Sequence, residues 1–244
     1  MILIFLIYGL FIGSFLNVCI LRIPSGISIV KPPSSCGSCG HRLKYRDMLP
    51  VVNYIIYRGR CRYCGSPYSI QYPLIELLNG LLYVFVYLKI GLTLNSVLYC
   101  FIISLLIIIS IIDLKHKIIP DRLNIAGVIL GTIYIIVNKT FFYSLIGASL
   151  GLGLFLAIAL LTNAMGGGDI KLMAALGLMF GIKGILFISL FSFVIGAFIS
   201  VLLIQLKLKG RKDEIPFGPF IALSALIYMF FGLEIINWYL ALFM

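Results

Sequence analysis

The chain has 244 residues, of which 62% are hydrophobic and only 11% are charged. Ordinary soluble domains carry about 25% charged residues, so this composition excludes that class and indicates a protein that lies in a lipid bilayer. The formal net charge is +11, and we interpret it as a topology signal, with no nucleic-acid partner.

Long apolar runs alternate with short polar stretches along the chain. A membrane span needs about 20 apolar residues, because each backbone polar group must be paired inside its own helix. The first run, residues 1–21, lacks the basic start and cleavage site of a signal peptide, so we expect a retained span. Seven further spans are predicted at residues 73–90, 96–113, 123–138, 143–163, 170–182, 184–206 and 217–233. The predicted fold class is an all-α polytopic membrane protein of about eight transmembrane helices.

With eight spans, 16 of the 19 Lys and Arg lie at one face of the membrane. The other face holds Lys89, Lys139 and Lys183. The excess of Lys and Arg in cytoplasmic loops predicts that the 16-charge face is cytoplasmic and that the N-terminus is outside. Basic residues at this face would also contact anionic membrane lipid.

Residues 22–72 form the only predicted extramembrane segment of domain size, and they lie between the first two spans. The sequence therefore predicts three parts. They are a first transmembrane helix at 1–21, a small cytoplasmic zinc-knuckle domain at 22–72, and a transmembrane bundle at 73–244.

Two Cys-x-x-Cys turns mark the small domain, each followed by a glycine that suits a tight turn. Their cysteines are Cys36, Cys39, Cys61 and Cys64. Four thiolates at this spacing can bind one tetrahedral Zn²⁺. Two disulfides are the alternative, which the reducing cytoplasm disfavours. Zinc with four sulfur ligands has no open position for chemistry, so we expect it to be structural.

Two of the eight acidic residues end or begin predicted spans on the same side of the membrane. Asp113 closes a strongly apolar run, and Asp169 closes the turn Gly166-Gly167-Gly168-Asp169. Carboxylates in an apolar bundle are candidate functional groups. Held close together, two carboxyl groups share a proton, so one can act as a base while the other polarises a carbonyl.

Each acidic residue also has an ordinary explanation. Asp113 could pair with Lys115 or Lys117, and Asp169 with Lys171. Asp121 follows Pro120 directly before an apolar run, which favours an N-cap of the fourth span.

Glu76 lies early in the second span, where an arginine of the small domain could neutralise it. Two other functions remain open from the residues alone. One is a proton-coupled transporter that uses the same carboxylates as a relay, and the other is a zinc-bearing membrane scaffold.

In combination, these stretches resemble the prepilin peptidase family, the type IV leader peptidases and N-methyltransferases of bacterial inner membranes. The matching segments are Gly13-Ser-Phe-Leu-Asn-Val18, the double Cys-x-x-Cys domain with Tyr72-Pro-Leu-Ile-Glu76, Asp113 with Ile119-Pro-Asp121, Gly166-Gly167-Gly168-Asp169, and Pro216-Phe-Gly-Pro219. Gly37 departs from the proline that the family often has in its first knuckle.

The resemblance implies cleavage of type IV prepilin or pseudopilin precursors by Asp113 and Asp169, at the cytoplasmic face of the inner membrane. It also implies N-methylation of the new N-terminus with S-adenosylmethionine, and it links Gly59 and Glu76 to that step. For Gly59, a turn before a zinc knuckle explains the residue equally well.

Overall fold

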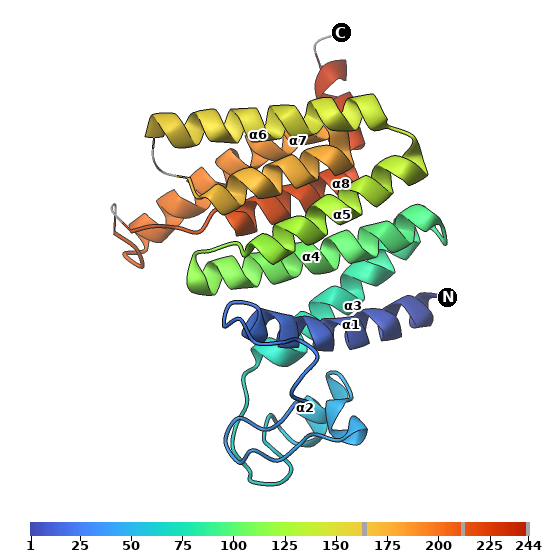
Figure 1. The fold of residues 1–244 in the computed structure, drawn as a ribbon, viewed down its shortest axis with the longest axis vertical. Helices are drawn as coiled ribbons and strands as arrows, with labels where there is room; N and C mark the ends of the chain where they lie inside the picture. Colours follow the sequence, from blue (N-terminus) through green and yellow to red (C-terminus); the bar gives the residue numbers. More distant parts are fainter. Residues whose placement is uncertain (163–164, 211–212, 243–244) are drawn as a thin grey trace. The chain divides into compact units, whose positions relative to one another are not determined.

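The structure, a computed structural model, describes residues 1–162, 165–210 and 213–242 (Figure 1). Its elements are α1 Ile2–Arg22, the 3₁₀ helix η1 Tyr45–Met48, α2 Val52–Ile56, α3 Gln71–Ile90, α4 Leu94–His116, α5 Asp121–Asn138, α6 Phe141–Thr162, α7 Gly167–Gln205 and α8 Gly218–Ala241. Three positions used in the sequence predictions lie outside the described residues: the end of the fifth span at 163, and the basic residues Arg211 and Lys212.

Within the described ranges, seven helices are long and apolar enough to cross a membrane. These are all the α-helices except the short α2, and the cysteine-bearing segment lies between α1 and α3. The predicted all-α fold with a small domain after the first span is therefore confirmed. The count of seven differs from the predicted eight because α7 contains both the sixth and the seventh predicted spans.

The helix α7 has 39 residues, and its backbone is non-helical at Gly181, with φ 63° and ψ −162°. A straight helix of this length would extend about 58 Å, nearly twice the thickness of the hydrocarbon core. A Cβ built on Gly151 would lie 2.6 Å from the carbonyl oxygen of Met173 and 2.9 Å from Cγ1 of Ile185. These two residues would be about 18 Å apart on a straight helix. The chain therefore folds back at Gly181, and α7 provides two segments that both contact α6.

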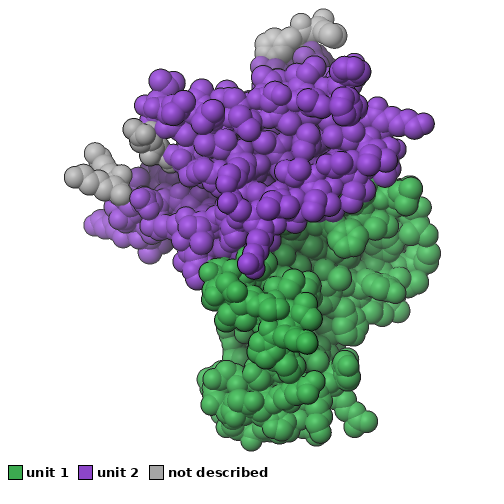
Figure 2. All heavy atoms as spheres, in the orientation of Figure 1, with its two compact units in different colours: residues 1–108 green, residues 109–244 purple. Residues whose placement is uncertain are grey.

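The chain divides into two compact units, Met1–Ile108 and Ile109–Met244, coloured separately in Figure 2. The boundary falls inside α4, so the first unit contains the small domain and the second contains both Asp113 and Asp169. The three-part division at residues 21 and 72 stays a prediction.

In the first unit, α1 and α3 pack through glycines and polar side chains. A Cβ on Gly9 would lie 2.7 Å from Cα of Gly80, so the two backbones are in close contact. Asn79 donates to the carbonyl oxygen of Gly9 at 2.7 Å and accepts a hydrogen bond from Ser104 at 3.0 Å, and Ser104 also contacts the Tyr83 hydroxyl at 2.8 Å. Small residues and interhelical hydrogen bonds of this kind hold membrane helices together.

In the second unit, α6 packs equally closely on α7. A Cβ on Gly147 would lie 2.6 Å from the carbonyl oxygen of Gly177 and 2.6 Å from Cα of Gly181. Those contacts are with backbone, which cannot move aside as a flexible side chain can. Glycine at 147 is therefore required for the packing of the first segment of α7, which carries Asp169.

We expect Gly147→Ala to lower the stability of the protein in detergent by about 1–3 kcal/mol, the usual range for overpacking. The matched control is Gly153→Ala on the same helix, because nothing lies within 4 Å of a Cβ at that position. Thermal unfolding of both purified variants measures the difference. Equal unfolding temperatures would contradict the close packing of α6 on α7.

Candidate active site and metal centre

The side chain of Asp169 lies in the first turn of α7. The N-cap of this helix is Gly166, and a backbone hydrogen bond joins Gly166 to the Asp169 carboxyl group. Because a carboxylate only accepts, Gly166 N–H is the donor, and an acid three residues after the N-cap commonly satisfies that group. The other oxygen, Oδ1, is buried and has no hydrogen-bond partner among the described residues.

The three glycines before Asp169 differ in their surroundings. A Cβ on Gly168 would lie 2.8 Å from Cβ of Ile119, and the Gly168 carbonyl accepts a hydrogen bond of 3.4 Å from Asn124. A Cβ on Gly167 would meet nothing within 4 Å. Gly168 therefore has a packing role against the turn before α5, and Gly167 is the glycine with open space beside it.

Asp113 lies in the last turn of α4 and is 5% exposed. Its Oδ2 accepts a hydrogen bond of 2.8 Å from the backbone N–H of Gly218, the first residue of α8. The first N–H groups of a helix have no partner within the helix. The carboxylate at the end of α4 therefore accepts a hydrogen bond from a free N–H group at the start of α8.

The structure brings the two aspartates together. Both lie in the second unit, where Asp113 is buried, Asp169 is half-buried with its Oδ1 atom buried, and Asp169 is within Coulomb range of Asp113. They come from different helices, α4 and α7. Two such groups can hold one shared proton and act on a water molecule between them.

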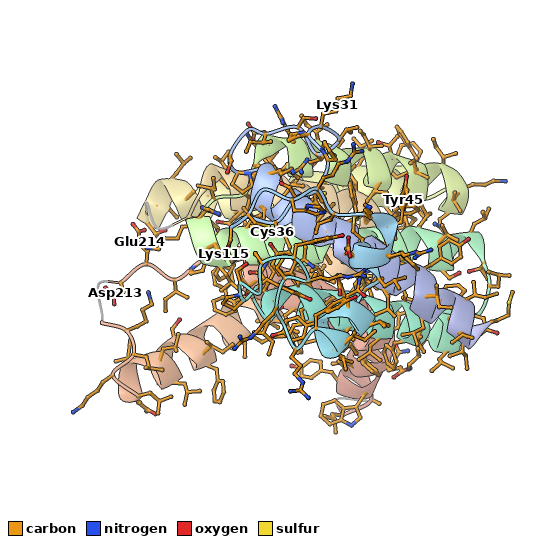
Figure 3. All side chains as sticks on the ribbon, turned by 90° about the horizontal axis from the view of Figure 1, so that it is seen from below. Lys31, Cys36, Tyr45, Lys115, Asp213 and Glu214 are labelled. Carbon is orange, nitrogen blue, oxygen red and sulfur yellow. The ribbon has the colours of Figure 1, made fainter. Side chains whose placement is uncertain are left out.

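Two of the three lysines proposed as ordinary partners form ion pairs with other acids. Lys171 forms an ion pair of 2.6 Å with Asp121. Lys117, two residues after the Lys115 labelled in Figure 3, forms an ion pair of 3.3 Å with Glu214. Neither lysine therefore neutralises the two aspartates.

The prediction that Asp121 caps the fourth span is wrong. The N-cap of α5 is Pro120, and Asp121 is the first residue of the helix, without a side-chain cap hydrogen bond. Its carboxylate instead pairs with Lys171, fifty residues later in the chain. Asp121 thus pairs with a lysine far away in the chain and not with the N–H groups of its own helix. The sequence of α5 contains no feature that predicts this ion pair.

The four predicted cysteines form one cluster that could hold a metal ion. Their Sγ atoms all lie within 4.8 Å of one another, and those of Cys36 and Cys64 are 3.9 Å apart. Tetrahedral Zn–S bonds of about 2.3 Å would place sulfurs about 3.8 Å apart. All four cysteines are free, so the alternative of two disulfides is not what the structure contains.

The two knuckles have the same backbone design. The amide of Cys36 donates to the carbonyl of His41 at 2.9 Å, and the amide of Cys61 donates to the carbonyl of Ser66 at 2.8 Å. The glycines that follow, Gly40 and Gly65, have φ of 70° and 73°. This left-handed conformation favours glycine, as the sequence predicted.

The thiols of the cluster cannot all ionise easily without a cation. Backbone N–H groups of Cys39 and Ser38 donate to the sulfur of Cys36 and lower its pKa to about 6. A backbone hydrogen bond from His41 lowers the pKa of Cys39, but burial and the neighbouring Cys36 and Cys64 raise it to about 11. A bound cation would remove this mutual repulsion and stabilise four thiolates.

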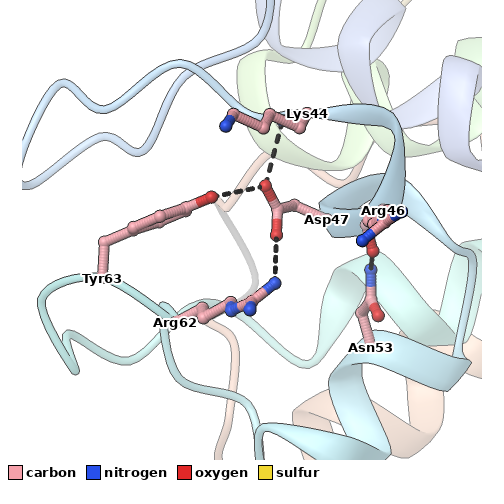
Figure 4. A network of polar contacts seen from close by, with 6 residues as sticks. All are labelled: Lys44, Arg46, Asp47, Asn53, Arg62 and Tyr63. Atoms are coloured by element: carbon pink, nitrogen blue, oxygen red, sulfur yellow. Dashed lines mark hydrogen bonds and ion pairs between the residues drawn. The ribbon is translucent and has the colours of Figure 1, made fainter.

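A network of polar contacts that the sequence did not predict joins the segment after the first knuckle to the second knuckle (Figure 4). Asp47 accepts hydrogen bonds of 3.0 Å from the Lys44 amide and 3.0 Å from the Tyr63 hydroxyl, and Arg62 lies 3.8 Å away. The hydrogen bond from Lys44 is the main reason that the pKa of Asp47 is lowered. The His41 ring contacts that of Tyr63 in a tilted arrangement, with centroids 3.6 Å apart. The network and the ring contact together link the segment after the first knuckle to the second knuckle.

Gly59 and Glu76, the residues linked to methylation by resemblance, lie near the same tyrosine. The Tyr68 amide donates to the carbonyl of Gly59 at 2.9 Å, and the Glu76 charge is within Coulomb range of Tyr68. Both residues also have structural roles. Gly59 has φ 68° and lies against the ring of Tyr54, and Glu76 accepts a hydrogen bond of 2.7 Å from the Val51 amide. The proposed pairing of Glu76 with an arginine is therefore replaced by a backbone contact.

Two family models match most of the chain. Residues 7–90 match the bacterial peptidase A24 N-terminal domain, and residues 100–201 match the type IV leader peptidase family. The chain belongs to the type IV leader peptidase family. The proposed site residues Asp113 and Asp169 both lie within the second match.

Relatives within this family align over almost the whole chain. A prepilin leader peptidase/N-methyltransferase of Legionella pneumophila is 34% identical, with 98% of this chain and 96% of the relative covered. Proteins of the same name from Xanthomonas campestris and Bacillus subtilis are 34% and 33% identical, covering 95% and 96% of this chain and 92% and 96% of the relatives. No solved structure matches the chain.

Proposed function

We propose that this enzyme removes the leader peptide of type IV prepilin or pseudopilin precursors with the carboxyl pair of Asp113 and Asp169. The observation that carries the proposal is the pair itself. The carboxyl groups of Asp113 and Asp169 lie on separate helices within Coulomb range of each other, and Lys117 and Lys171 are paired with other acids.

The chemistry follows from one shared proton. The ionised carboxylate of the pair takes a proton from water, and the water oxygen attacks the carbonyl carbon of the scissile bond. The protonated partner donates a hydrogen bond to the carbonyl oxygen. Collapse of the tetrahedral intermediate breaks the C–N bond, and the amine leaves with a proton from the pair. The pair then holds one proton again.

The substrate is proposed to enter as a membrane helix and to be cut at the cytoplasmic face, after the glycine of its leader. The apolar surface of the bundle suits a helix that arrives through lipid. The distribution of Lys and Arg supports an orientation with the N-terminus outside and the cysteine domain in the cytoplasm. We place the enzyme in the bacterial inner membrane on the grounds of its family.

We propose that the cysteine cluster binds one structural Zn²⁺. The sulfur geometry fits a tetrahedral ion, and four cysteine ligands fill its coordination shell. Zinc would supply folding free energy to a small domain with little apolar core.

The methyl donor implied by the family is S-adenosylmethionine, which would supply a methyl group to the new N-terminal amine. The residues near Tyr68 are compatible with its positive sulfonium. Glu76 provides a carboxylate, and the rings of Tyr54 and Tyr72 lie 5.2 Å and 6.1 Å from that of Tyr68. Carboxylates and aromatic faces are the groups that bind such cations.

Asp113→Asn and Asp169→Asn are each expected to reduce leader cleavage at least about 10³-fold, because an amide cannot share the proton that the pair needs. The control is Asp121→Asn, an exposed acid of the same unit, which should keep most activity. Cleavage of a purified prepilin in detergent is followed by mass spectrometry. Near-normal cleavage by either of the first two variants would refute the pair, and complete loss in a folded Asp121→Asn protein would change the assignment of roles.

Metal analysis of the purified enzyme should find about one Zn²⁺ per chain. The double variant Cys36→Ser/Cys61→Ser removes one ligand from each knuckle and should lose the ion and unfold at a lower temperature. Cys19→Ser/Cys100→Ser is the matched control, because both cysteines lie outside the cluster. A metal-free preparation with full stability and activity would remove zinc from the proposal.

A further inference from the structure

The contact of Asp113 with the start of α8 leaves room only for glycine at position 218. Gly218 N–H is the donor to Oδ2 at 2.8 Å, and a Cβ on Gly218 would lie 2.8 Å from the same oxygen. It would also lie 3.2 Å and 3.3 Å from Cγ and Cβ of Asp113. Any larger residue at 218 must therefore displace the Asp113 side chain.

The local sequence prepares this contact. Gly218 is the first residue of α8, so its N–H has no partner within the helix, and Pro219 follows directly. Proline fits the first turn of a helix because its fixed φ matches the helix and it has no N–H to satisfy. The first turn is thus held rigidly with the Gly218 N–H directed at Asp113.

The start of α8 is also fixed from its other side. The rings of Phe217 and Phe220 pack near Gly196 in the second segment of α7, where a Cβ would lie 3.4 Å and 3.0 Å from them. Phe217 further packs against Phe155 and Phe193, with centroids 6.2 Å and 5.0 Å apart. The start of α8, which carries the Gly218 N–H, is therefore held against α6 and α7.

We propose that Gly218 is a positioning residue for peptide cleavage, which fixes one oxygen of Asp113 and so orients its carboxyl group toward Asp169. The inference depends on the proposed catalytic pair. Beyond that pair, we infer that glycine is needed at position 218 to place the Asp113 carboxyl group for the reaction, and not only to start the helix α8. Gly218 acts through Asp113 and does not touch the substrate.

The test compares cleavage kinetics of Gly218→Ala, Gly153→Ala and the unaltered full-length enzyme in detergent with a purified prepilin. We expect kcat of Gly218→Ala to fall about 10²-fold, with KM changed less than about threefold. A displacement of up to about 1 Å misaligns the carboxyl group for the reaction but does not remove contacts that bind the substrate. Gly153→Ala makes the same substitution in the same unit, but nothing lies within 4 Å of a Cβ at that position, so it should stay within about threefold of the unaltered enzyme.

A second readout separates positioning from damage to the fold. The same preparations are given a prepilin already cleaved by the unaltered enzyme, together with S-adenosylmethionine, and methylation is followed by mass spectrometry. Gly218→Ala should methylate this substrate within about twofold of the unaltered enzyme. Cleavage within threefold of normal, or an equal loss of cleavage and methylation, would overturn the role of Gly218.

If Gly218→Ala unfolds in detergent, the double variant Asp113→Ala/Gly218→Ala decides the question by its unfolding temperature. Removal of the Asp113 side chain should restore stability if the added Cβ clashes with that side chain. Failure to restore it would place the damage elsewhere and overturn the proposal. The Asp113→Asn enzyme reports on the pair separately, because its activity tests the proposed function without altering Gly218.

Discussion

The carboxyl groups of Asp113 and Asp169 lie in an apolar bundle and need hydrogen-bond donors. The arrangement of the helices in the second unit provides those donors. Each aspartate is held by a backbone N–H at the start of a helix, Asp169 by Gly166 of α7 and Asp113 by Gly218 of α8. These N–H groups have no partner within their own helices. The carboxylates and the helix ends thus satisfy each other, which makes acidic side chains tolerable at these positions.

That arrangement depends on close packing of the surrounding helices. The reversal at Gly181 lets both segments of α7 contact α6, and Gly147 and Gly151 let α6 approach them. The second segment in turn packs at Gly196 against the first turn of α8. The glycines therefore determine the distance between the start of α7 and the start of α8, and through it the separation of the two carboxyl groups.

The sequence predicted the parts of the site that carry a side-chain signal. Acids in apolar runs are rare, and paired Cys-x-x-Cys turns have few uses, so Asp113, Asp169 and the cysteines stood out. Gly218 did not, because its contribution is a backbone N–H and only the fold shows where that group points. Asp121 was assigned wrongly because capping is a local rule, and Lys171 lies far from it in the chain. The two predicted spans within α7 are separated only by Gly181, whose backbone is non-helical, so the structure counts them as one element.

Glu76 shows how this chain arranges a buried carboxylate that stabilises structure. Its Oε2 accepts the amide of Val51, a β-branched residue with φ 61°, a conformation that such residues rarely adopt without support. A single acid with a backbone donor is sufficient for that purpose. Asp113 and Asp169 each have a backbone donor as well, yet they also face a second carboxyl group, which raises the free energy of the folded state whenever both are ionised. This cost has no structural return that the contacts of the two acids show, and it is the property that the proposed sharing of one proton requires.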